Sequence, residues 1–103
     1  MRYNLSITEK AEKQLDRLVY YLFLVLENQQ AASHLLSSVE TMYDRLGSNP
    51  YQFPMCDDIF LKRKGYRKAH LPDMSYHMIF EILDSTVYVL GIFHDLEQFN
   101  TKL

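Results

Sequence analysis

The spacing of apolar residues changes along the chain, and each spacing predicts a different element. Residues 2–7 alternate between polar and apolar side chains, which is typical of a strand with one buried face. Apolar residues then recur every three or four positions over 11–26 and again over 30–46, which predicts two amphipathic helices. Because only a few residues separate these helices, we expect them to pack antiparallel.

Polar residues and a glycine mark where the helices begin and end. Ser6 or Thr8 can cap the first helix, and Glu9 and Glu12 lie in its first turn, where the helix dipole favours acidic groups. Gly47 is predicted to adopt the left-handed conformation just past the end of the second helix.

The last third of the chain predicts three strands, at 66–71, 75–83 and 86–94. Pro72-Asp73-Met74 and Asp84-Ser85 are the turn signals between them. Connections this short produce antiparallel hairpins, so the three strands are expected to form a meander.

The order of these elements predicts an α+β fold. The N-terminal strand, the antiparallel helical hairpin and the three-stranded antiparallel meander are expected to form a four-stranded sheet with the helices on one face. The opposite face is expected to be concave and exposed. Residues 49–58 carry two prolines and are expected to form a loop. At 103 residues, the chain is expected to be a single domain, residues 1–103.

The composition excludes several classes of protein. A hydrophobic content of 48% is typical of an ordered domain, and no apolar run approaches the ~20 residues that a membrane span needs. The N-terminus has no signal-peptide pattern, so we expect a cytoplasmic protein without membrane contact. Cys56 is the single cysteine, which excludes an internal disulfide and a zinc knuckle, and no metal or cofactor is predicted.

Positive charge is concentrated at the entry to the three strands. The net charge is −2, so indiscriminate wrapping around nucleic acid is not expected. Five of the eleven Lys and Arg residues form what we call the basic cluster: Lys62, Arg63, Lys64, Arg67 and Lys68. Together with the three strands, this cluster is expected to form one surface that binds a macromolecular target, its phosphates or an acidic partner. The alternative is a solvated charged loop that offsets Asp57 and Asp58.

Short motifs follow one another in a definite order along the chain. They are Ala11-x3-Leu15, Tyr20-Tyr21, Asn28 with Ala31-Ala32, Leu46 before Asn49-Pro50, Gly65-Tyr66-Arg67, Tyr76-x3-Phe80-x-Ile82 and Ile92-Phe93-His94. In this order and spacing the chain resembles the RelE/ParE superfamily, the toxins of type II toxin–antitoxin systems. The resemblance covers nearly the whole chain.

The resemblance implies a small protein that arrests growth and is neutralised by a cognate antitoxin, whose C-terminal segment wraps around it. Such a pair represses its own operon, and operator DNA is contacted only indirectly, through the antitoxin. RelE-like toxins enter the ribosomal A site and cleave mRNA. ParE-like toxins poison DNA gyrase without a known nuclease site.

Cleavage of RNA through the 2′-hydroxyl requires an acid, a base and cations near the phosphate. Lys68 and His70 stand on the second strand, where cleaving RelE-like toxins carry basic residues, and His77 replaces the arginine usual at the start of the third strand. These three are the candidate catalytic residues if the chain is an endonuclease, with Arg67 as the phosphate clamp. Residues 95–97, however, are Asp-Leu-Glu where cleaving members are basic, and acids there repel phosphate.

Two further histidines are expected to have no catalytic role. His94 ends the last strand and is predicted to make a structural hydrogen bond, whereas His34 is predicted to lie on the surface of the second helix.

The residues after the last strand favour the ParE-like branch. The chain is then expected to arrest growth by binding a macromolecular target, with DNA gyrase favoured. One alternative is a RelE-like, ribosome-dependent mRNA endonuclease. Another is a degenerate member that keeps the fold and antitoxin binding but is not toxic. Whether the protein is an enzyme stays open at this point.

Overall fold

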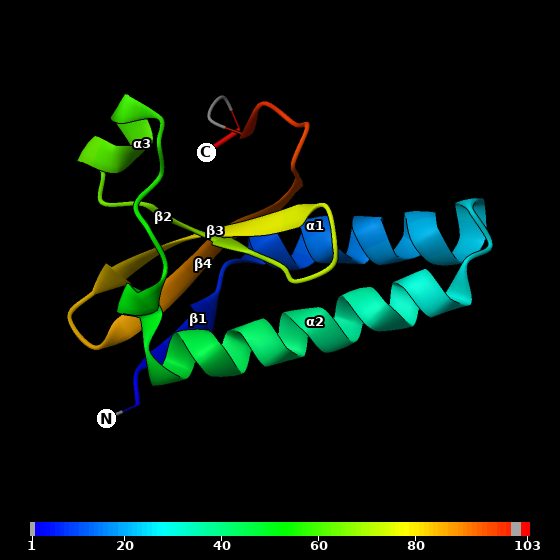
Figure 1. Cartoon of the computed structure of the whole chain (residues 1–103), viewed down its shortest axis with the longest axis horizontal. Coiled ribbons are helices and arrows are strands. Elements are labelled where there is room, and N and C mark those ends of the chain that lie inside the picture. Colours follow the sequence, from blue (N-terminus) through cyan, green and yellow to red (C-terminus); the bar gives the residue numbers. More distant parts are fainter. Residues whose placement is uncertain (1, 100–101) are drawn as a thin grey trace.

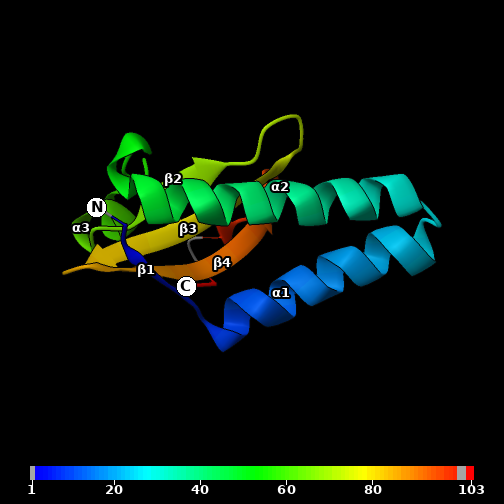
Figure 2. The same cartoon turned by 90° about the horizontal axis from the view of Figure 1, so that it is seen from below.

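The elements follow the expected order. The computed structural model describes residues 2–99 and 102–103 (Figure 1). The elements are strand β1 (Asn4–Ile7), helix α1 (Glu9–Tyr20), π-helical turn η1 (Tyr21–Val25), helix α2 (Gln29–Ser48), 3-10 turn η2 (Pro50–Gln52), helix α3 (Ile59–Arg63), and strands β2 (Arg67–His70), β3 (Tyr76–Leu83) and β4 (Thr86–His94). Helices α1 and α2 form an antiparallel hairpin along the sheet (Figure 2).

Both long helices begin at a side-chain cap. Thr8 Oγ1 accepts a hydrogen bond from the Ala11 N–H at 3.2 Å, and Asn28 Oδ1 accepts one from the Ala31 N–H at 3.0 Å. These bonds satisfy backbone donors that have no partner within the helix. Of the two residues expected to cap α1, Thr8 is the one that does so.

Gly47 does not adopt the expected left-handed conformation, so that prediction is wrong. It lies inside α2, and the glycine with a positive φ in the described part of the chain is Gly65, at 81°. Gly47 instead allows the N-terminal segment to approach closely. Its carbonyl accepts a hydrogen bond from the Tyr3 N–H at 2.7 Å, and Arg2 lies against its Cα.

The predicted four-stranded α+β arrangement is confirmed. The strand order is β1-β4-β3-β2, in which β1 is parallel to β4 and the other neighbours are antiparallel. Strand β1 pairs only with Thr86–Val89, so it covers the first half of β4 and leaves the second half without a neighbouring strand on that side.

Strand β4 contains a β-bulge that the hydrophobic pattern did not predict. Ile79 pairs with Gly91 and Phe80 pairs with Val89, so Leu90 is the additional residue on β4. The bulge reverses the alternation of side chains along the strand. Val89 and Ile92 therefore pack in the core under the helices, and Phe93 packs on the opposite face.

The main core lies between the helical hairpin and one face of the sheet. Most of its large buried side chains come from α2, β3 and β4: Leu35, Val39, Met42, Leu46, Met78, Phe80, Val87, Val89 and Ile92. Ala11 of α1, Ala69 of β2 and Leu71 are also fully buried in it. These residues occupy the positions that the helical and strand periods predicted, and their burial is the dominant stabilising contribution.

The opposite face of the sheet is not exposed as expected. A second, smaller core covers part of it and consists of Cys56, Leu61, Ile79 and Phe93, with Phe99 and Leu103 packed against it. The covering segments are α3 and the C-terminal segment. Burial raises the pKa of the Cys56 thiol to about 11, so this thiol stays protonated at neutral pH.

Helix α3 was not predicted, because two prolines just before it indicated a loop. Asp58 Oδ1 accepts hydrogen bonds from the N–H groups of Phe60 and Leu61, at 2.9 and 3.1 Å, and so starts the helix. An aspartate immediately before an apolar run is the signal that identifies this start.

Substituting alanine at Gly91 is expected to destabilise the protein by about 1–3 kcal/mol. A Cβ at this position would lie 2.5 Å from Phe93 Cε2 and 2.9 Å from Gln14 Oε1, and Phe93 is fully buried and cannot move aside. The matched control is Gly47→Ala, whose Cβ would approach only the end of the exposed Arg2 side chain closely, at 2.7 Å from Nη2, with the Tyr3 carbonyl at 3.7 Å. Alanine there favours the helix by about 1 kcal/mol. Urea unfolding measures both, and equal costs would contradict the packing described at Gly91.

Candidate functional site

The five residues of the basic cluster lie on two different elements, α3 with the residue after it and strand β2. Lys62, Arg63 and Lys64 are exposed on and just after α3, which packs on the second face of the sheet only through Leu61 (Figure 1). The other two members, Arg67 and Lys68, lie on β2, where neighbouring side chains point to opposite faces. The basic cluster is therefore not the single surface that the sequence predicted.

Arg67 faces the helical side of the sheet and is held by contacts within the protein. Its Nη1 donates a hydrogen bond to the Phe53 carbonyl at 2.7 Å, and its guanidinium lies 5.0 Å from the centre of the Tyr51 ring. These contacts fix the segment before α3 against β2. Substitution of Arg67 would therefore disturb the fold as well as the surface charge.

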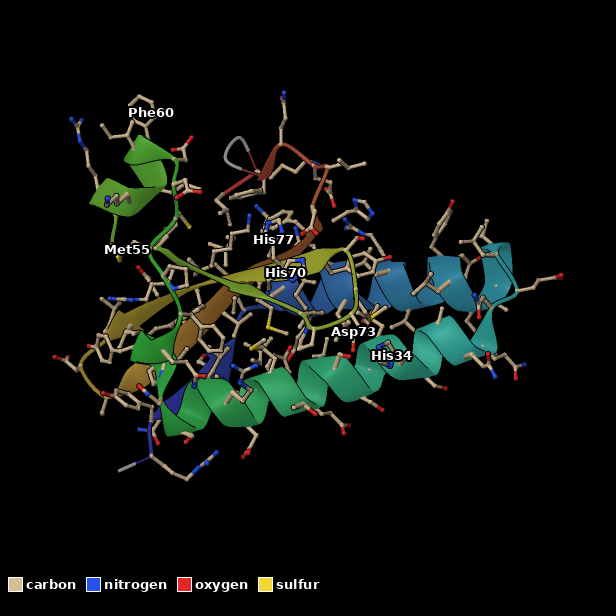
Figure 3. The ribbon with its side chains drawn as sticks, in the orientation of Figure 1. His34, Met55, Phe60, His70, Asp73 and His77 are labelled. Atoms are coloured by element: carbon tan, nitrogen blue, oxygen red, sulfur yellow. The ribbon has the colours of Figure 1, made fainter. Side chains whose placement is uncertain are left out.

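The three candidate catalytic residues share the other face of the sheet. Lys68 pairs with Ile79, and His70 pairs with His77 directly across β2 and β3 (Figure 3). The Lys68 ammonium lies 5.6 Å from the centre of the Phe99 ring, in the C-terminal segment. The sheet thus brings together these three residues, but Arg67, the expected phosphate clamp of the endonuclease alternative, lies on the opposite face.

Asp95 links the two histidines, and the sequence reasoning did not anticipate this role. Its Oδ1 lies 2.9 Å from His77 Nδ1, and its Oδ2 lies 2.9 Å from His70 Nε2. Because an ionised carboxylate only accepts hydrogen bonds, each imidazole presents an N–H to it. We call these three residues the histidine–aspartate cluster. Asp95 follows His94, the last residue of β4. An acidic residue at this end of β4, close to the predicted positions of His70 and His77, is the signal that could have identified its role.

Burial controls the protonation of this cluster. His77 is fully buried (0% exposed), and burial lowers the pKa of its imidazole, although the hydrogen bond to Asp95 partly opposes that shift. Burial alone would raise the pKa of Asp95, but hydrogen bonds from His77 and His70 outweigh it and lower that pKa. In the described part of the chain, His77 Nε2 is buried without a hydrogen-bond partner, and the centres of the His77 and Phe99 rings are 4.6 Å apart.

This burial predicts that acid destabilises the protein. Above pH ~6.5 both folded and unfolded His77 are neutral, and its contribution to stability is complete. Below that pH the unfolded imidazole binds a proton first, because the folded pKa is lowered. The free energy of unfolding should therefore fall by up to about 1.4 kcal/mol per pH unit until the folded pKa is reached, as measured by urea unfolding between pH 7.5 and 5.

Two variants test the source of this pH dependence. His77→Asn retains an N–H donor but does not titrate, so its stability should change less between pH 6.5 and 5. His34→Asn is the matched control, because His34 is exposed on α2 away from the cluster, and it should retain the original slope. Identical slopes in the two variants would show that His77 is not responsible.

Residues 95–97 form a turn that closes β4. The His94 N–H donates to Glu97 Oε1 at 2.9 Å, and the Leu96 N–H donates to His94 Nδ1 at 3.1 Å. The predicted structural hydrogen bond of His94 is confirmed, as is the exposure of His34. Within residues 2–99 and 102–103, no three His, Cys, Asp or Glu side chains are arranged to hold a metal ion. None of the described helices is long and apolar enough to cross a membrane.

The family model of the ParE toxin of the type II toxin–antitoxin system parDE matches residues 5–99. The chain belongs to the ParE toxin family. This match includes all the helices and, apart from the first residue of β1, all the strands described above. A search of curated proteins finds no match to this sequence.

Solved structures with the same fold come from several bacteria. The chromosomal ParDE system of P. aeruginosa contains a chain with a TM-score of 0.71 and 18% identity, covering 90% of this toxin and 96% of that chain. A chain of the RelBE2 toxin–antitoxin complex of Mycobacterium tuberculosis has a TM-score of 0.64 and 20% identity, with 91% and 99% coverage. A conserved protein of Helicobacter pylori has a TM-score of 0.58 and 14% identity, with 92% and 97% coverage. At these identities, the similarity shows a shared RelE/ParE-like fold.

Proposed function

We propose that this ParE-family toxin arrests growth by binding DNA gyrase and not by cleaving RNA. The observation that carries the proposal is the state of the candidate acid–base residues. His77 is fully buried, and the Asp95 carboxylate is hydrogen-bonded to one ring nitrogen of His77 and one of His70. In the proposed account, this carboxylate also adds a negative charge at the position where a phosphate would bind. His77 is therefore inaccessible as a base, and although His70 is exposed, the Asp95 carboxylate beside it weakens the positive field that phosphate chemistry needs.

Helix α3 supports a protein target. Ile59 and Phe60 are 56% and 68% exposed, and they stand beside the cations Lys62, Arg63 and Lys64. Exposed aromatic and aliphatic anchors flanked by basic residues are typical of protein interfaces, where the anchors supply affinity and the charges supply orientation. We propose that α3 contacts the target, and that Lys68 contributes at its edge.

A cognate antitoxin is the second proposed partner. The tip of the helical hairpin exposes a continuous apolar run that folding leaves uncovered: Tyr20, Tyr21, Phe23, Leu24, Val25 and Leu26. Apolar patches of this kind on a small protein mark a surface that a partner covers. Binding of an antitoxin segment there would conceal the patch, and operator DNA would be contacted only through the antitoxin.

The mRNA endonuclease remains a second candidate because of one observation. Lys68, His70 and His77 share one face of β2 and β3, as that mechanism requires. The C-terminal segment would have to leave this face before His77 could contact RNA. A toxin that has lost activity is the third candidate, and growth after induction distinguishes it from the other two.

Purified gyrase tests the proposal directly. The toxin is expected to inhibit supercoiling of relaxed plasmid by gyrase in a dose-dependent manner, and an equal concentration of the toxin should leave topoisomerase I, the control enzyme, unaffected. Full gyrase activity in the presence of folded toxin, together with cleavage of mRNA on purified ribosomes, would support the endonuclease candidate instead.

A further inference from the structure

The second half of β4 presents an open sheet edge within a groove. Because β1 ends at Ile7, no strand among the described residues lies beside the segment Leu90–His94 on that side. A groove of about 540 Å³ lies there, between α1, β4 and the C-terminal segment. Its lining residues are Lys10, Gln14, Arg17, Leu18, Ile92, Glu97 and Lys102.

Side chains take the place of the missing strand along this edge. Gln14 Oε1 accepts a hydrogen bond from the Ile92 N–H at 3.0 Å, and Glu97 Oε1 accepts one from the His94 N–H at 2.9 Å. These two N–H groups belong to residues i and i+2 of β4, and N–H groups at this spacing point to the same edge of a strand. A neighbouring strand would accept hydrogen bonds from both of them. The bulge at Leu90 turns them toward the groove, so the same irregularity that places Phe93 also creates this edge.

The charge of the groove indicates which kind of peptide it can bind. Lys10 and Arg17 both line it, and within the described residues neither forms an ion pair. Lys102 Nζ forms an ion pair with Glu97 Oε2 at 2.6 Å, so the charges of these two residues offset each other. The groove therefore carries a net positive charge from α1, which favours carboxylates in a bound segment.

We propose that this groove binds an extended acidic peptide segment of a partner protein, which adds to β4 as a strand in line with β1. The peptide backbone would accept hydrogen bonds from the N–H groups of Ile92 and His94 and displace Gln14 and Glu97. Its acidic side chains would pair with Lys10 and Arg17. Strand addition of this kind gives affinity through the backbone and selectivity through alternate side chains.

The groove is separate from the surface proposed for the toxin target. Strand β2 and helix α3 lie toward the opposite edge of the sheet, since the strand order is β1-β4-β3-β2. The inference therefore does not depend on whether gyrase is the target.

Fluorescence anisotropy with labelled peptides tests the proposal. The probe is an eight-residue peptide of alternating valine and glutamate, and saturable binding is expected. The same peptide with lysine in place of glutamate should bind at least about tenfold more weakly. A glutamate peptide with every backbone nitrogen methylated should also lose about tenfold, because N-methyl groups on both of its edges block strand pairing with β4 whichever edge it presents.

Variants of the toxin locate the binding. The double substitution Lys10→Gln and Arg17→Gln should weaken binding of the valine–glutamate peptide about tenfold or more. The double substitution Lys62→Gln and Arg63→Gln is the matched control, since it also removes one lysine and one arginine, both exposed on α3 and outside this groove, and it should stay within about twofold. Gln14→Ala should strengthen binding a few-fold, because it removes the side chain that competes for the Ile92 N–H.

Three results would overturn the proposal. They are the absence of saturable binding up to about 1 mM peptide, equal binding of the methylated peptide, and an unchanged affinity in the Lys10 and Arg17 double variant. NMR provides an independent readout, since the amide signals of Ile92 and His94 should shift on addition of the peptide and those of α3 should not.

Discussion

Neutralising Lys62, Arg63 and Lys64 to glutamine is expected to reduce growth arrest at least tenfold at a fixed level of induction. These side chains are exposed on and beside α3 and make no ion pair in the described structure. Their main internal contact is that of Lys64 Nζ with the Tyr66 ring, 5.7 Å from its centre, so their loss changes chiefly the surface. Removing three charges that orient a complex is expected to weaken association by about 1.4–2.8 kcal/mol, or roughly tenfold to a hundredfold. Surviving colonies after induction without the antitoxin provide the measurement.

A matched triple variant separates this effect from net charge. Gln29→Glu, Gln30→Glu and Ser33→Glu also change the charge by three units, but at exposed positions in the first turns of α2, where the helix dipole favours acids. This control should remain toxic. If both variants kill equally well, α3 does not contact the target, and if both lose toxicity, the overall charge matters and not the position.

Truncating Phe80 to alanine is expected to destabilise the toxin by about 3–5 kcal/mol. Phe80 is fully buried at the centre of β3 and packs edge-on against Phe53, with ring centres 6.1 Å apart, so its removal leaves a cavity that the sheet cannot close. Phe60→Ala is the matched control and should cost less than about 0.5 kcal/mol, because Phe60 is exposed on α3.

The same pair of variants also separates stability from function. Urea unfolding should show a large loss for Phe80→Ala and almost none for Phe60→Ala, whereas toxicity should fall in Phe60→Ala although it remains folded. A stable and fully toxic Phe60→Ala variant would remove this side chain from the proposed target surface. A small loss of stability in Phe80→Ala would contradict the description of the main core.

The elements of the fold could be predicted because each has a regular period and a clear terminus. The helical periods over 11–26 and 30–46 and the alternation in the last third arise from one buried face per element, which is what the main core contains. The order of these elements and the short connections then restrict the sheet to few arrangements.

The second face of the sheet could not be predicted in the same way. The five residues of α3 are too few to show a period, and Phe99 and Leu103 lie outside any regular element. The bulge at Leu90 also reverses the alternation, so a strict period of two assigns Phe93 to the wrong face. Gly91, inside a strand, was the available signal for the bulge.

The candidate site was partly predictable for a related reason. Lys68, His70 and His77 were placed on one face because strand pairing follows from short turns. The separation of Arg67 from Lys68 follows from the alternation of side chains along β2 and could have been predicted from the expected strand. The burial of His77, in contrast, depends on Phe99, in the segment that folds back onto the sheet after β4. Such long-range contacts leave no local pattern in the sequence.

The order in which macromolecular syntheses stop after induction tests the central claim most directly. Cells that express the toxin without an antitoxin are pulse-labelled with thymidine, uridine and methionine at short intervals. If the toxin binds gyrase, thymidine incorporation should fall first, while methionine incorporation continues. Methionine incorporation that falls first, with thymidine unaffected, would contradict the account and indicate an attack on translation.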